Sequence, residues 1–360
     1  MGGSNNTMNT KPMVEGAMLT ALTIVLCLAG TYIPVLGSFI QLFWPVPIAV
    51  LVFRHGLRVG VLATVVSGLL LLMLTGPINF VITILGFGLL GLVLGFALRR
   101  KLSAPQIILW GAVASAVSIL AMLGLTIWMT GQNPIDMMIS IQMKSFKQSM
   151  PMLIELAKNS GNSRQATQMQ EMVKEFPRLM HLILPAALVV AAVFSSFLNF
   201  VVASKVLTKM RTTVPKLPPF TMWRFPVWTA YVYIIGLGLT LFSKPLHSDQ
   251  MFALGYNIVV SFSYVFLIGG ISLMIYFFKR TTVPKRLKVV AAILAFVFIQ
   301  LVFQVIIYIG IFDSIFNYRA YLIRRGFAEK TKSVNPPEEA SLPEHAESKE
   351  NEEHEDDEEK

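Results

Sequence analysis

The sequence predicts an all-α fold, a polytopic bundle of about nine transmembrane helices. Between Glu15 and Asp136 the chain has no acidic residue, and the basic residues of that stretch stand only in two clusters, 54–58 and 99–101. Long apolar runs interrupted only by positive charge are typical of membrane-spanning segments. Hydrophobic residues make up 54% of the 360-residue chain and charged residues only 14%, which is unlike an ordinary soluble domain.

Nine segments approach the length of about 20 apolar residues that crosses the hydrocarbon core of a bilayer. They are 14–33, 38–53, 57–75, 78–98, 106–130, 179–204, 225–242, 251–278 and 288–311. The second is short and contains Trp44-Pro45-Val46-Pro47, so we expect it to be kinked or partly interfacial. Residues 1–12 are expected to be disordered and lack the features of a removable signal, so the first helix should remain as an anchor.

Lys and Arg are concentrated in alternate connections. They occur in 54–58, 99–101, 205–224 and 279–288, whereas the other short connections contain only Lys244. The positive-inside rule therefore places the first set, and with it the N-terminus, in the cytoplasm of a bacterial cell, with the spans in its plasma membrane. Nine crossings would put the C-terminus outside. However, Arg319, Arg324 and Arg325 closely follow the last span, so the side of the tail stays open.

The long connection 131–178 is expected to form an extracytoplasmic, amphipathic helical hairpin. The motif 133–136 supplies an N-cap asparagine, a proline at the first helical position and an acid in the first turn. Apolar residues recur every three or four positions over 139–157, which predicts the first helix. A break at 159–162 precedes a second helix over 163–176, which ends before a proline. The hairpin either lies on the bilayer surface and caps the bundle, or forms a Met-rich lid over a substrate cavity.

The net charge of the chain divides into two regions of opposite sign. Residues 1–313 hold 23 Lys and Arg against 7 Asp and Glu, while residues 314–360 hold 7 against 13. The acidic segment 326–360 has few apolar residues to bury and is expected to be a disordered tail. The basic residues of the first region suit lipid headgroups, and no basic stripe with exposed aromatics predicts nucleic-acid binding.

Ionisable residues inside spans are the default functional candidates of a membrane protein. From the second to the eighth span no carboxylate lies within the membrane-spanning part of a helix. Only Glu15 and Asp313 remain, at helix ends that nine crossings would place on opposite faces. Ion-driven carriers usually need a carboxylate at mid-depth, so a self-contained carrier is disfavoured. Motifs of hydrolases, metal sites and phosphate-binding loops are absent, and we expect neither an enzyme nor a cofactor.

Six polar residues mark the last span and the turn after it. They are Gln300, Gln304, Tyr308, Asp313, Asn317 and Arg319. The first three are spaced four apart and stack on one helix face, Asp313 and Asn317 form a second pair beyond them, and Arg319 falls on a different face. This candidate polar site of the terminal helix either bonds to neighbouring helices or faces a ligand or gate.

One hexapeptide occurs twice. Arg211-Thr-Thr-Val-Pro-Lys216 recurs as Arg280-Thr-Thr-Val-Pro-Lys285, each time after a long span in an expected cytoplasmic connection. It fits an interfacial turn in which threonine satisfies the freed backbone and proline stops the helix. Alternatively, the two copies are paired docking points for a cytoplasmic partner.

Small residues also recur four positions apart, a spacing that lets helices approach closely. The pairs are Ala17 and Ala21, Gly91 and Gly95, and Gly111 and Ser115.

Three motifs together resemble the YybS-like family of predicted bacterial membrane proteins of unknown function. They are Glu15-Gly-Ala-Met-Leu-Thr-Ala-Leu, Phe53-Arg-His-Gly-Leu-Arg58 and Gly310-Ile-Phe-Asp-Ser-Ile-Phe-Asn-Tyr-Arg319. The resemblance covers about 12–325. That family is distantly similar to the substrate-capturing S-components of energy-coupling-factor vitamin transporters. In those, six helices bind a small molecule from outside, and small residues of the first helix contact the transmembrane coupling subunit.

The resemblance implies an S-component-like bundle of six spans in 13–204, with three further spans in 205–325. It implies that Glu15, Ala17 and Ala21 contact a partner, and that the chain captures a small solute for uptake with ATPase coupling subunits. The three extra spans, the hairpin and the tail depart from the S-component pattern. The alternative is a membrane scaffold in envelope or morphogenesis machinery that binds its partners through the repeated hexapeptide loops.

Overall fold

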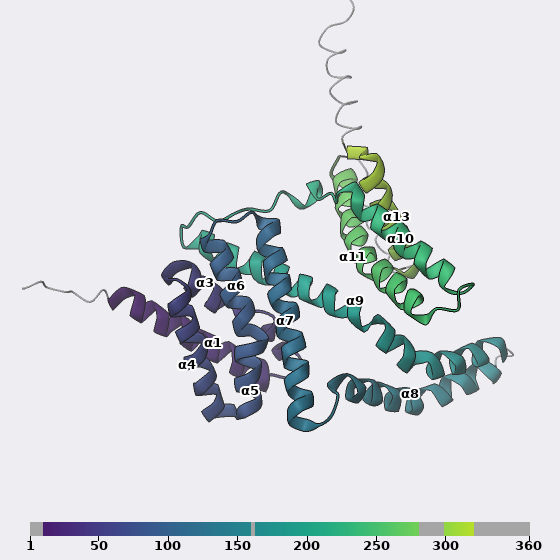
Figure 1. Cartoon of the computed structure of the whole chain (residues 1–360), viewed down its shortest axis with the longest axis horizontal. Coiled ribbons are helices and arrows are strands. Elements are labelled where there is room, and N and C mark those ends of the chain that lie inside the picture. The colour runs from purple at the N-terminus through teal and green to yellow at the C-terminus, as the bar shows by residue number, and fades with distance from the viewer. Residues whose placement is uncertain (1–9, 160–162, 281–298, 320–360) are drawn as a thin grey trace, which may run out of the picture. The chain divides into compact units, whose positions relative to one another are not determined.

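The computed structural model describes residues 10–159, 163–280 and 299–319, and every regular element in these ranges is a helix (Figure 1). The expected all-α class is confirmed. Six of the described helices are long and apolar enough to cross a bilayer: Met13–Tyr32, Leu57–Thr75, Ile82–Arg99, Ala104–Thr130, Thr167–Lys209 and Asp249–Lys279. Three shorter apolar helices fall in the second, seventh and ninth expected spans: Phe39–His55, Val227–Ser243 and Leu301–Phe316.

The second expected span is broken, as its prolines predict. Helix α1 (Thr10–Tyr32) is followed by the short α2 (Leu36–Gln41) and then by α3 (Pro45–His55). Pro45 and Pro47 have no backbone N–H group, and between α2 and α3 the α-helical bonds give way to a tighter turn, in which the N–H groups of Phe43 and Val46 bond to the carbonyls of Ile40 and Phe43. All residues of the first two turns of α3 are buried, which makes it a core helix of the bundle.

Glycines set the ends of two long helices. Helix α4 (Leu57–Thr75) lies between Gly56 and Gly76, whose φ angles are 95° and 91°. Helix α7 (Ala104–Thr130) ends at Gly131, with a φ of 66°. Side chains with a Cβ rarely adopt these angles, so glycine turns the chain there without strain.

The fourth expected span contains a π-helical segment. Helix α5 (Pro77–Val81), η1 (Ile82–Gly88) and α6 (Leu89–Arg99) follow one another directly. The π-helical geometry of η1 is rare and recurs at functional sites. In α6, Gly91 and Gly95 bring the helix close to α3, because a Cβ on Gly95 would lie 2.5 Å from a backbone oxygen of α3. The pair therefore serves the close helix packing that its spacing predicts.

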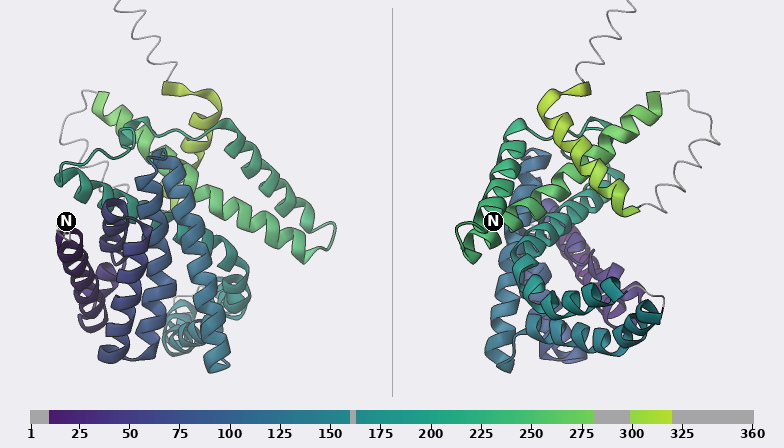
Figure 2. Two further views of the ribbon diagram at one scale, coloured as in Figure 1. Left: turned by 60° about the vertical axis from the view of Figure 1, so that its left-hand side comes forward. Right: turned by 90° about the vertical axis from the view of Figure 1, so that its right-hand side faces the viewer.

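The main apolar core lies where α3, α6, α7 and α9 (Ser163–Lys209) meet, and Figure 2 shows α4, α6 and α7 standing side by side. Its buried residues are Val46, Ala49, Val50, Leu90, Leu94, Ala97, Leu98, Ala104, Ile107, Phe200, Ala203 and Leu207. On α7, Gly111 faces Ser196 of α9, whose hydroxyl donates a hydrogen bond to the carbonyl of Ile108 at 2.8 Å. The pair of Gly111 and Ser115 thus also serves packing within the chain.

The expected helical hairpin is present. It consists of α8 (Pro134–Asn159) and the first part of α9 (Figure 1). The Oδ1 of Asn133 accepts a hydrogen bond from the N–H of Ile135 at 3.0 Å, as expected for the N-cap. Phe146 packs edge to face on Phe176, with 4.8 Å between the ring centroids, and so joins the two arms of the hairpin.

The expected end of the second hairpin helix at residue 176 is wrong. Helix α9 continues through Pro177 and Pro185 to Lys209, so the hairpin helix and the sixth span are one helix of 47 residues. At 1.5 Å per residue it is about 70 Å long, more than twice the thickness of the hydrocarbon core, about 30 Å. The helix is therefore longer than a single crossing of the bilayer requires.

A side chain from α11 (Asp249–Arg280) explains how α9 passes through Pro185. The amide nitrogen of Asn257 donates to the carbonyl of Leu182 at 2.8 Å, and its amide oxygen accepts from the N–H of Ala186 at 2.8 Å. In a regular helix these two backbone groups bond to each other. The Asn257 amide is inserted between them, so a neighbouring helix satisfies the pair of backbone groups that is open one residue beyond the position where Pro185 already lacks an N–H.

The last described helices are α10 (Val227–Ser243), α11 and α13 (Ile299–Phe316), with a 3₁₀ turn, η2 (Phe220–Met222), before α10. Their buried core is formed by Ala230, Tyr233, Phe266, Ile307 and Ile311.

Helix α13 extends beyond the expected end of the last span at residue 311, so Asp313 lies inside the helix. The Arg224 guanidinium donates to the carbonyls of Asp313 and Ser314, at 3.4 and 3.1 Å. A cation at the C-terminal turn of a helix stabilises its open carbonyls.

The residues up to Ile315 form one compact unit, and Phe316–Lys360 form a second. The boundary expected at 204/205 does not separate these units, because α9 crosses it and packs on α11. Residues 316–319 are the described part of the second unit. The expected disordered segments 1–9 and 326–360 lie outside the described residues.

Charged residues gather at two places in the first unit. At the first, the Arg54 guanidinium lies 3.8 Å from the sulfur of Met210. Arg99 contacts the carbonyl of Val52 at 3.5 Å. These contacts bring together the basic clusters near residues 54, 99 and 209. At the second, Arg178 pairs with Asp249 at 3.2 Å. The basic connections near 54, 99 and 209 thus lie together, as expected from the occurrence of Lys and Arg in alternate connections.

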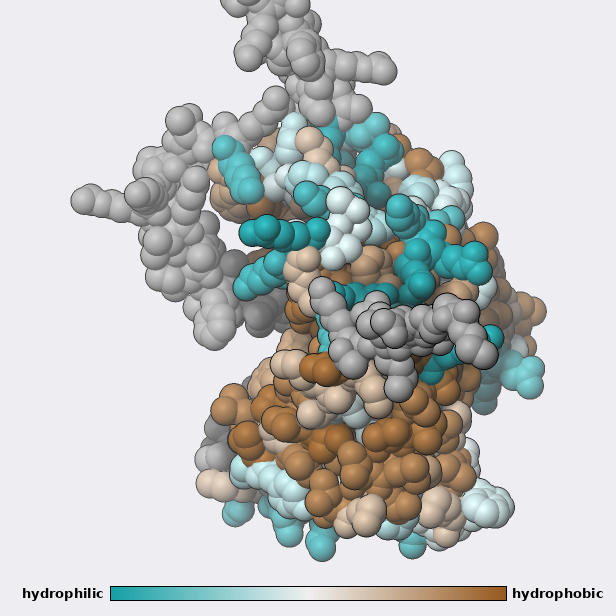
Figure 3. All heavy atoms as spheres, turned by 90° about the vertical axis from the view of Figure 1, so that its left-hand side faces the viewer, coloured by the Kyte–Doolittle hydropathy of each residue, from teal (hydrophilic) through white to brown (hydrophobic). Residues whose placement is uncertain are grey.

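The surface between such charged regions is apolar. Figure 3 shows a broad area of hydrophobic side chains bordered by hydrophilic ones. On α1 and α4 the exposed apolar side chains include Met18, Leu22, Leu62, Leu69 and Met73. Such a surface fits contact with lipid tails.

Candidate functional site

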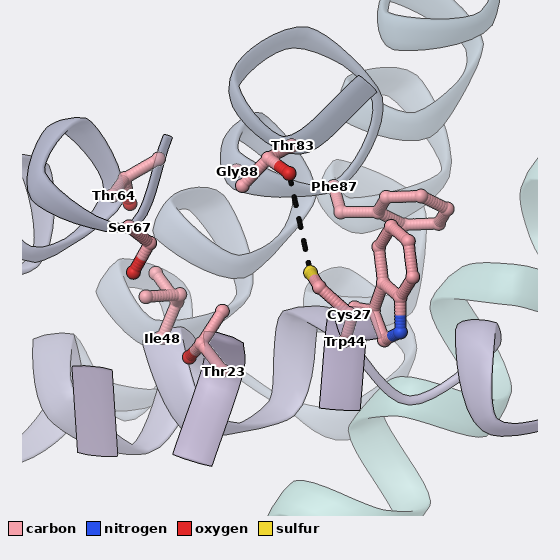
Figure 4. Close-up of a pocket in the computed structure, with 9 residues that line it drawn as sticks. All are labelled: Thr23, Cys27, Trp44, Ile48, Thr64, Ser67, Thr83, Phe87 and Gly88. Carbon is pink, nitrogen blue, oxygen red and sulfur yellow. Dashed lines mark hydrogen bonds between the residues drawn. The ribbon is translucent and has the colours of Figure 1, made fainter. Parts of the chain in front are cut away.

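A small buried cavity lies inside the N-terminal helices. Nine residues from α1, the start of α3, α4 and η1 line it (Figure 4): Thr23, Cys27, Trp44, Ile48, Thr64, Ser67, Thr83, Phe87 and Gly88. The space open to the centre of a water molecule is about 10 Å³, which is roughly the room that one water needs. None of the nine residues is charged.

Three residues with hydroxyl groups stand on one side of the cavity, and the surface that the cavity exposes is almost wholly apolar. The hydroxyls of Thr23 and Thr64 donate to the carbonyls of Leu19 and Gly60, one turn back in their own helices, at 2.9 Å each. Their protons are therefore committed, and each oxygen keeps lone pairs that can accept a further hydrogen bond. Ser67 is fully buried, and its hydroxyl has no hydrogen-bond partner among the described residues. A buried polar group in this state calls for a bound water or ligand.

Aromatic rings and the chain's single cysteine form the other side (Figure 4). Trp44 and Phe87 pack edge to face, with 4.7 Å between their centroids. The Trp44 indole N–H donates to the carbonyl of Leu26 at 2.8 Å, so Trp44 offers the cavity only its ring. The Cys27 sulfur lies 3.9 Å from the Thr83 hydroxyl.

Two irregular stretches of backbone meet at this cavity. Trp44 stands at the break between α2 and α3, and Phe87 belongs to the π-helical η1. The break is held from α9, where the amide nitrogen of Asn199 donates to the carbonyl of Leu42 at 3.0 Å. Its amide oxygen is buried without a hydrogen-bond partner among the described residues.

Glu15 takes part in a second polar cluster, at the basic end of α1. Its carboxylate pairs with Arg54 at 2.6 Å and with His55 at 2.9 Å. Both partners lie at the end of α3, so the cluster joins the start of α1 to that helix. The Glu15 side chain is 19% exposed and is occupied within the chain.

Comparison with known proteins assigns these helices to a family. The family described as "Predicted membrane protein (DUF2232)" matches residues 21–314. The chain belongs to the DUF2232 family. It is 29% identical to "Uncharacterized protein YybS" of Bacillus subtilis (strain 168), over 86% of this chain and 98% of the relative. No solved structure matches the chain. The expected YybS-like membership is confirmed, and neither description names an activity.

In the structure of this DUF2232 protein, the three residues expected to contact a partner differ in their exposure. Ala17 and Ala21 are exposed on the outer face of α1, where no other described part of the chain covers them. Glu15, by contrast, is half-buried in its ion pairs. The two alanines and Glu15 therefore do not form one continuous surface of free groups.

The six polar residues of the terminal helix are also divided. Gln304 and Tyr308 are exposed, whereas Asp313 is buried. The side chain of Gln300 lies outside the described residues. Asn317 follows α13 with a φ of 52°, a left-handed angle that asparagine adopts readily at helix ends, and it belongs to the second unit together with Arg319.

The first copy of the hexapeptide ends a helix, as expected. Arg211 has a φ of 60°. Its N–H donates to the carbonyl of Thr208, and the N–H of Thr212 donates to the carbonyl of Leu207, both at 3.0 Å. This pair of bonds is the Schellman pattern of a helix C-terminus. The second copy starts at Arg280, the last residue of α11, and continues through Lys285 outside the described residues. Whether either copy docks a partner stays a prediction.

Reasoning from the sequence missed the cavity residues. Thr20, Thr23 and Cys27 recur at the spacing of one helix face, and all three are buried on α1. That polar stripe within an apolar span was the available signal. Its partners on α4 and η1 could not be found from spacing, because the helices that meet α1 are set by tertiary packing.

Proposed function

We propose that this protein is the solute-capturing membrane subunit of an uptake system in the bacterial plasma membrane, similar to an S-component, with its N-terminus in the cytoplasm. The observation that carries the proposal is the buried cavity where the α2–α3 break meets the π-helical η1. Irregular backbone at membrane depth is tolerated where it lines a cavity. A polar, unpartnered Ser67 hydroxyl within it fits a site that awaits a ligand.

The charge distribution supports a partner as the source of energy. The Glu15 carboxylate is neutralised by Arg54 and His55 at the basic end of α1, and no acidic residue follows until Asp136. The N-terminal spans therefore lack a free carboxylate with which a driving ion could couple. ATPase coupling subunits would supply the energy, and the exposed Ala17 and Ala21 leave a flat strip on α1 where a partner helix can approach.

Purification of the tagged full-length chain from native membranes tests this function. We expect ATPase coupling subunits in the eluate, and we expect the Ala17→Leu/Ala21→Leu double variant to lose them. Val25→Leu is the matched control, since Val25 is also exposed on α1 at 58%, and it should retain the partners. Recovery of the folded wild-type chain without ATPase subunits would contradict the proposal.

A membrane scaffold is the second candidate, and the hairpin of α8 and α9 favours it. This hairpin exposes Met138, Met152 and Met172 at 67%, 70% and 62%. Exposed methionines form adaptable surfaces for partners. In the same purification, a scaffold would recover division or cell-wall proteins, and an Arg211→Ala/Lys216→Ala variant would release those bound through the first hexapeptide loop.

A further inference from the structure

Three arginines gather where the turn between α3 and α4 meets the end of α6. Arg58 is the second residue of α4, and Arg99 and Arg100 stand at the end of α6. The two helix ends are in contact, because a Cβ on Gly56 would lie 3.2 Å from the Nη1 of Arg99. All three arginine side chains are exposed. Cations from two separate connections therefore form one basic surface.

No carboxylate balances this surface in the part of the chain that the structure describes. The neighbouring acid, Glu15, is already paired with Arg54 and His55 at the end of α3. Between Glu15 and Asp136 the sequence contains no other acid. None of the three arginines forms an ion pair with a described residue. The surface therefore carries uncompensated positive charge that can attract an anion.

Contacts within the chain hold two of the guanidinium groups in place. The Nη1 of Arg99 lies 3.5 Å from the carbonyls of Val52 and Phe53, which end α3. Only Nη1 makes these contacts, so the N–H groups of the other two guanidinium nitrogens remain to donate to a ligand. The Arg100 guanidinium lies over the ring of Phe96, 5.2 Å from its centroid. Both groups are thus positioned at the surface before any ligand binds.

Exposed apolar side chains stand directly beside these cations. Leu57, next to Arg58, is 44% exposed, and Phe96, under Arg100, is 41% exposed. The apolar surface of α4 continues through Leu62, which is 65% exposed. A phosphate joined to hydrocarbon chains matches cations that border an apolar surface. A soluble anion or a nucleic acid would leave the apolar side chains without a partner.

We propose that Arg58, Arg99 and Arg100 form an arginine site that binds the phosphate of an anionic phospholipid, whose acyl chains run over Leu57 and Phe96. Zwitterionic phospholipids carry a cation close to their phosphate, and the arginines repel it. The arginine site therefore selects headgroups of net negative charge. This inference is independent of the proposed uptake function, since it concerns the lipid that surrounds the protein.

Native mass spectrometry of the full-length protein in a neutral detergent tests the arginine site. Phosphatidylglycerol and phosphatidylcholine with identical acyl chains are titrated separately, and the Kd of the first bound lipid is measured. Each arginine beside an anionic headgroup contributes about fivefold in Kd, which is about 1 kcal/mol. With three arginines, phosphatidylglycerol should bind about a hundredfold more tightly than phosphatidylcholine.

Paired substitutions separate the arginine site from the charge of the whole protein. Arg58→Gln/Arg100→Gln should weaken the binding of phosphatidylglycerol about 25-fold and leave that of phosphatidylcholine unchanged. Lys144→Gln/Lys147→Gln is the matched control, because it removes two exposed cations from α8, and it should bind like the wild type. Arg58→Lys/Arg100→Lys should recover most of the binding, since an ammonium also pairs with phosphate, and this variant separates lost charge from lost folding. Equal losses in the two glutamine variants would overturn the proposal.

Competitors distinguish a lipid from other anions. Inorganic phosphate and polyglutamate carry negative charge without hydrocarbon chains, so they make no apolar contact with Leu57 and Phe96. Neither should displace phosphatidylglycerol at equal concentration. Displacement by polyglutamate would assign the surface to an acidic protein instead, and displacement by phosphate would assign it to a soluble anion. Either result, or equal Kd values for the two lipids, would contradict a phospholipid site.

Discussion

The N-terminal helices and the last three helices of the first unit are both apolar, but they differ in how their interiors are built. Both regions bury hydroxyl residues, but around α1, α3, α4 and η1 the interior also contains an interrupted helix, a π-helix and a cavity. The core of α10, α11 and α13 consists of closely packed residues such as Tyr233 and Phe266, whose rings lie 5.5 Å apart. The difference suggests a division of labour, with binding in the first region and support in the second.

The contact between the two regions also supports a structural role for the last three helices. Asn257 of α11 satisfies the backbone of α9 at Pro185, and Arg224 stabilises the end of α13. These polar side chains are used for structure, whereas the Ser67, Ser118 and Ser204 hydroxyls and the Asn199 oxygen have no hydrogen-bond partner among the described residues. Polar groups that bind nothing within a tightly packed protein are the ones available to a ligand.

Overpacking the α3–α6 contact should produce the largest loss of stability. A side chain at Gly95 would meet the Ala49 carbonyl and Val52, so Gly95→Val should lower the free energy of unfolding by about 3 kcal/mol. Denaturation in mixed micelles measures this change. Gly124→Ala on α7 is the control, because its added Cβ meets nothing within 4 Å, and it should be neutral or slightly stabilising. Similar losses in both variants would show that the α3–α6 contact is not special.

Removal of the amide that joins the two regions should have the next largest effect. Asn257→Ala leaves the Leu182 carbonyl and the Ala186 N–H without a partner, so we expect a loss of about 2 kcal/mol in the same assay. Ser263→Ala on the same helix removes a hydroxyl that bonds to the Val259 carbonyl and to Tyr233 of α10 but opens no helix backbone, so it should cost less than Asn257→Ala. If Asn257→Ala were as stable as the wild type, the inserted amide would not hold α9 to α11.

The cluster at Glu15 should contribute less. Glu15→Gln removes the charge that pairs with Arg54 and His55, and the partly exposed site limits the expected loss to about 1 kcal/mol. Glu175→Gln is the control, because Glu175 is 59% exposed and lies 3.9 Å from Arg178, and its stability should match the wild type. An equal effect of the two substitutions would argue against a structural role for the Glu15 cluster.

Much of the fold could be predicted from charge and apolar length, because membrane insertion depends on these two properties directly. They gave the helical class, the break before Pro45 and the start of the hairpin at Asn133. They did not give the continuity of α9 through Pro177, since the rule that proline ends a helix fails where neighbouring groups satisfy the backbone. Charge and apolar length also did not predict that α13 extends past residue 311 to include Asp313, because the Arg224 that stabilises its end is distant in the sequence.

The candidate site was predictable only in part. The glycine pair at 91 and 95 gave a helix contact from its spacing alone. The cavity depends on Thr64, Ser67 and Phe87 meeting α1, and no local pattern relates residues so far apart in the sequence. Ala17 and Ala21 remain a predicted contact, with their exposure on α1 as the supporting observation.

The central claim is that the N-terminal region binds a ligand and the last three helices do not. It is tested most directly by two buried thiols, the native Cys27 and one introduced by Ala230→Cys in a Cys27→Ser background. The two positions are 2% and 0% exposed; Cys27 lines the cavity, and Ala230 belongs to the packed core of the last helices. The account predicts that hydroxyethyl methanethiosulfonate, an uncharged thiol reagent, modifies Cys27 in the folded protein and reaches the second thiol only after unfolding. Equal modification of both thiols, or of neither, would contradict it.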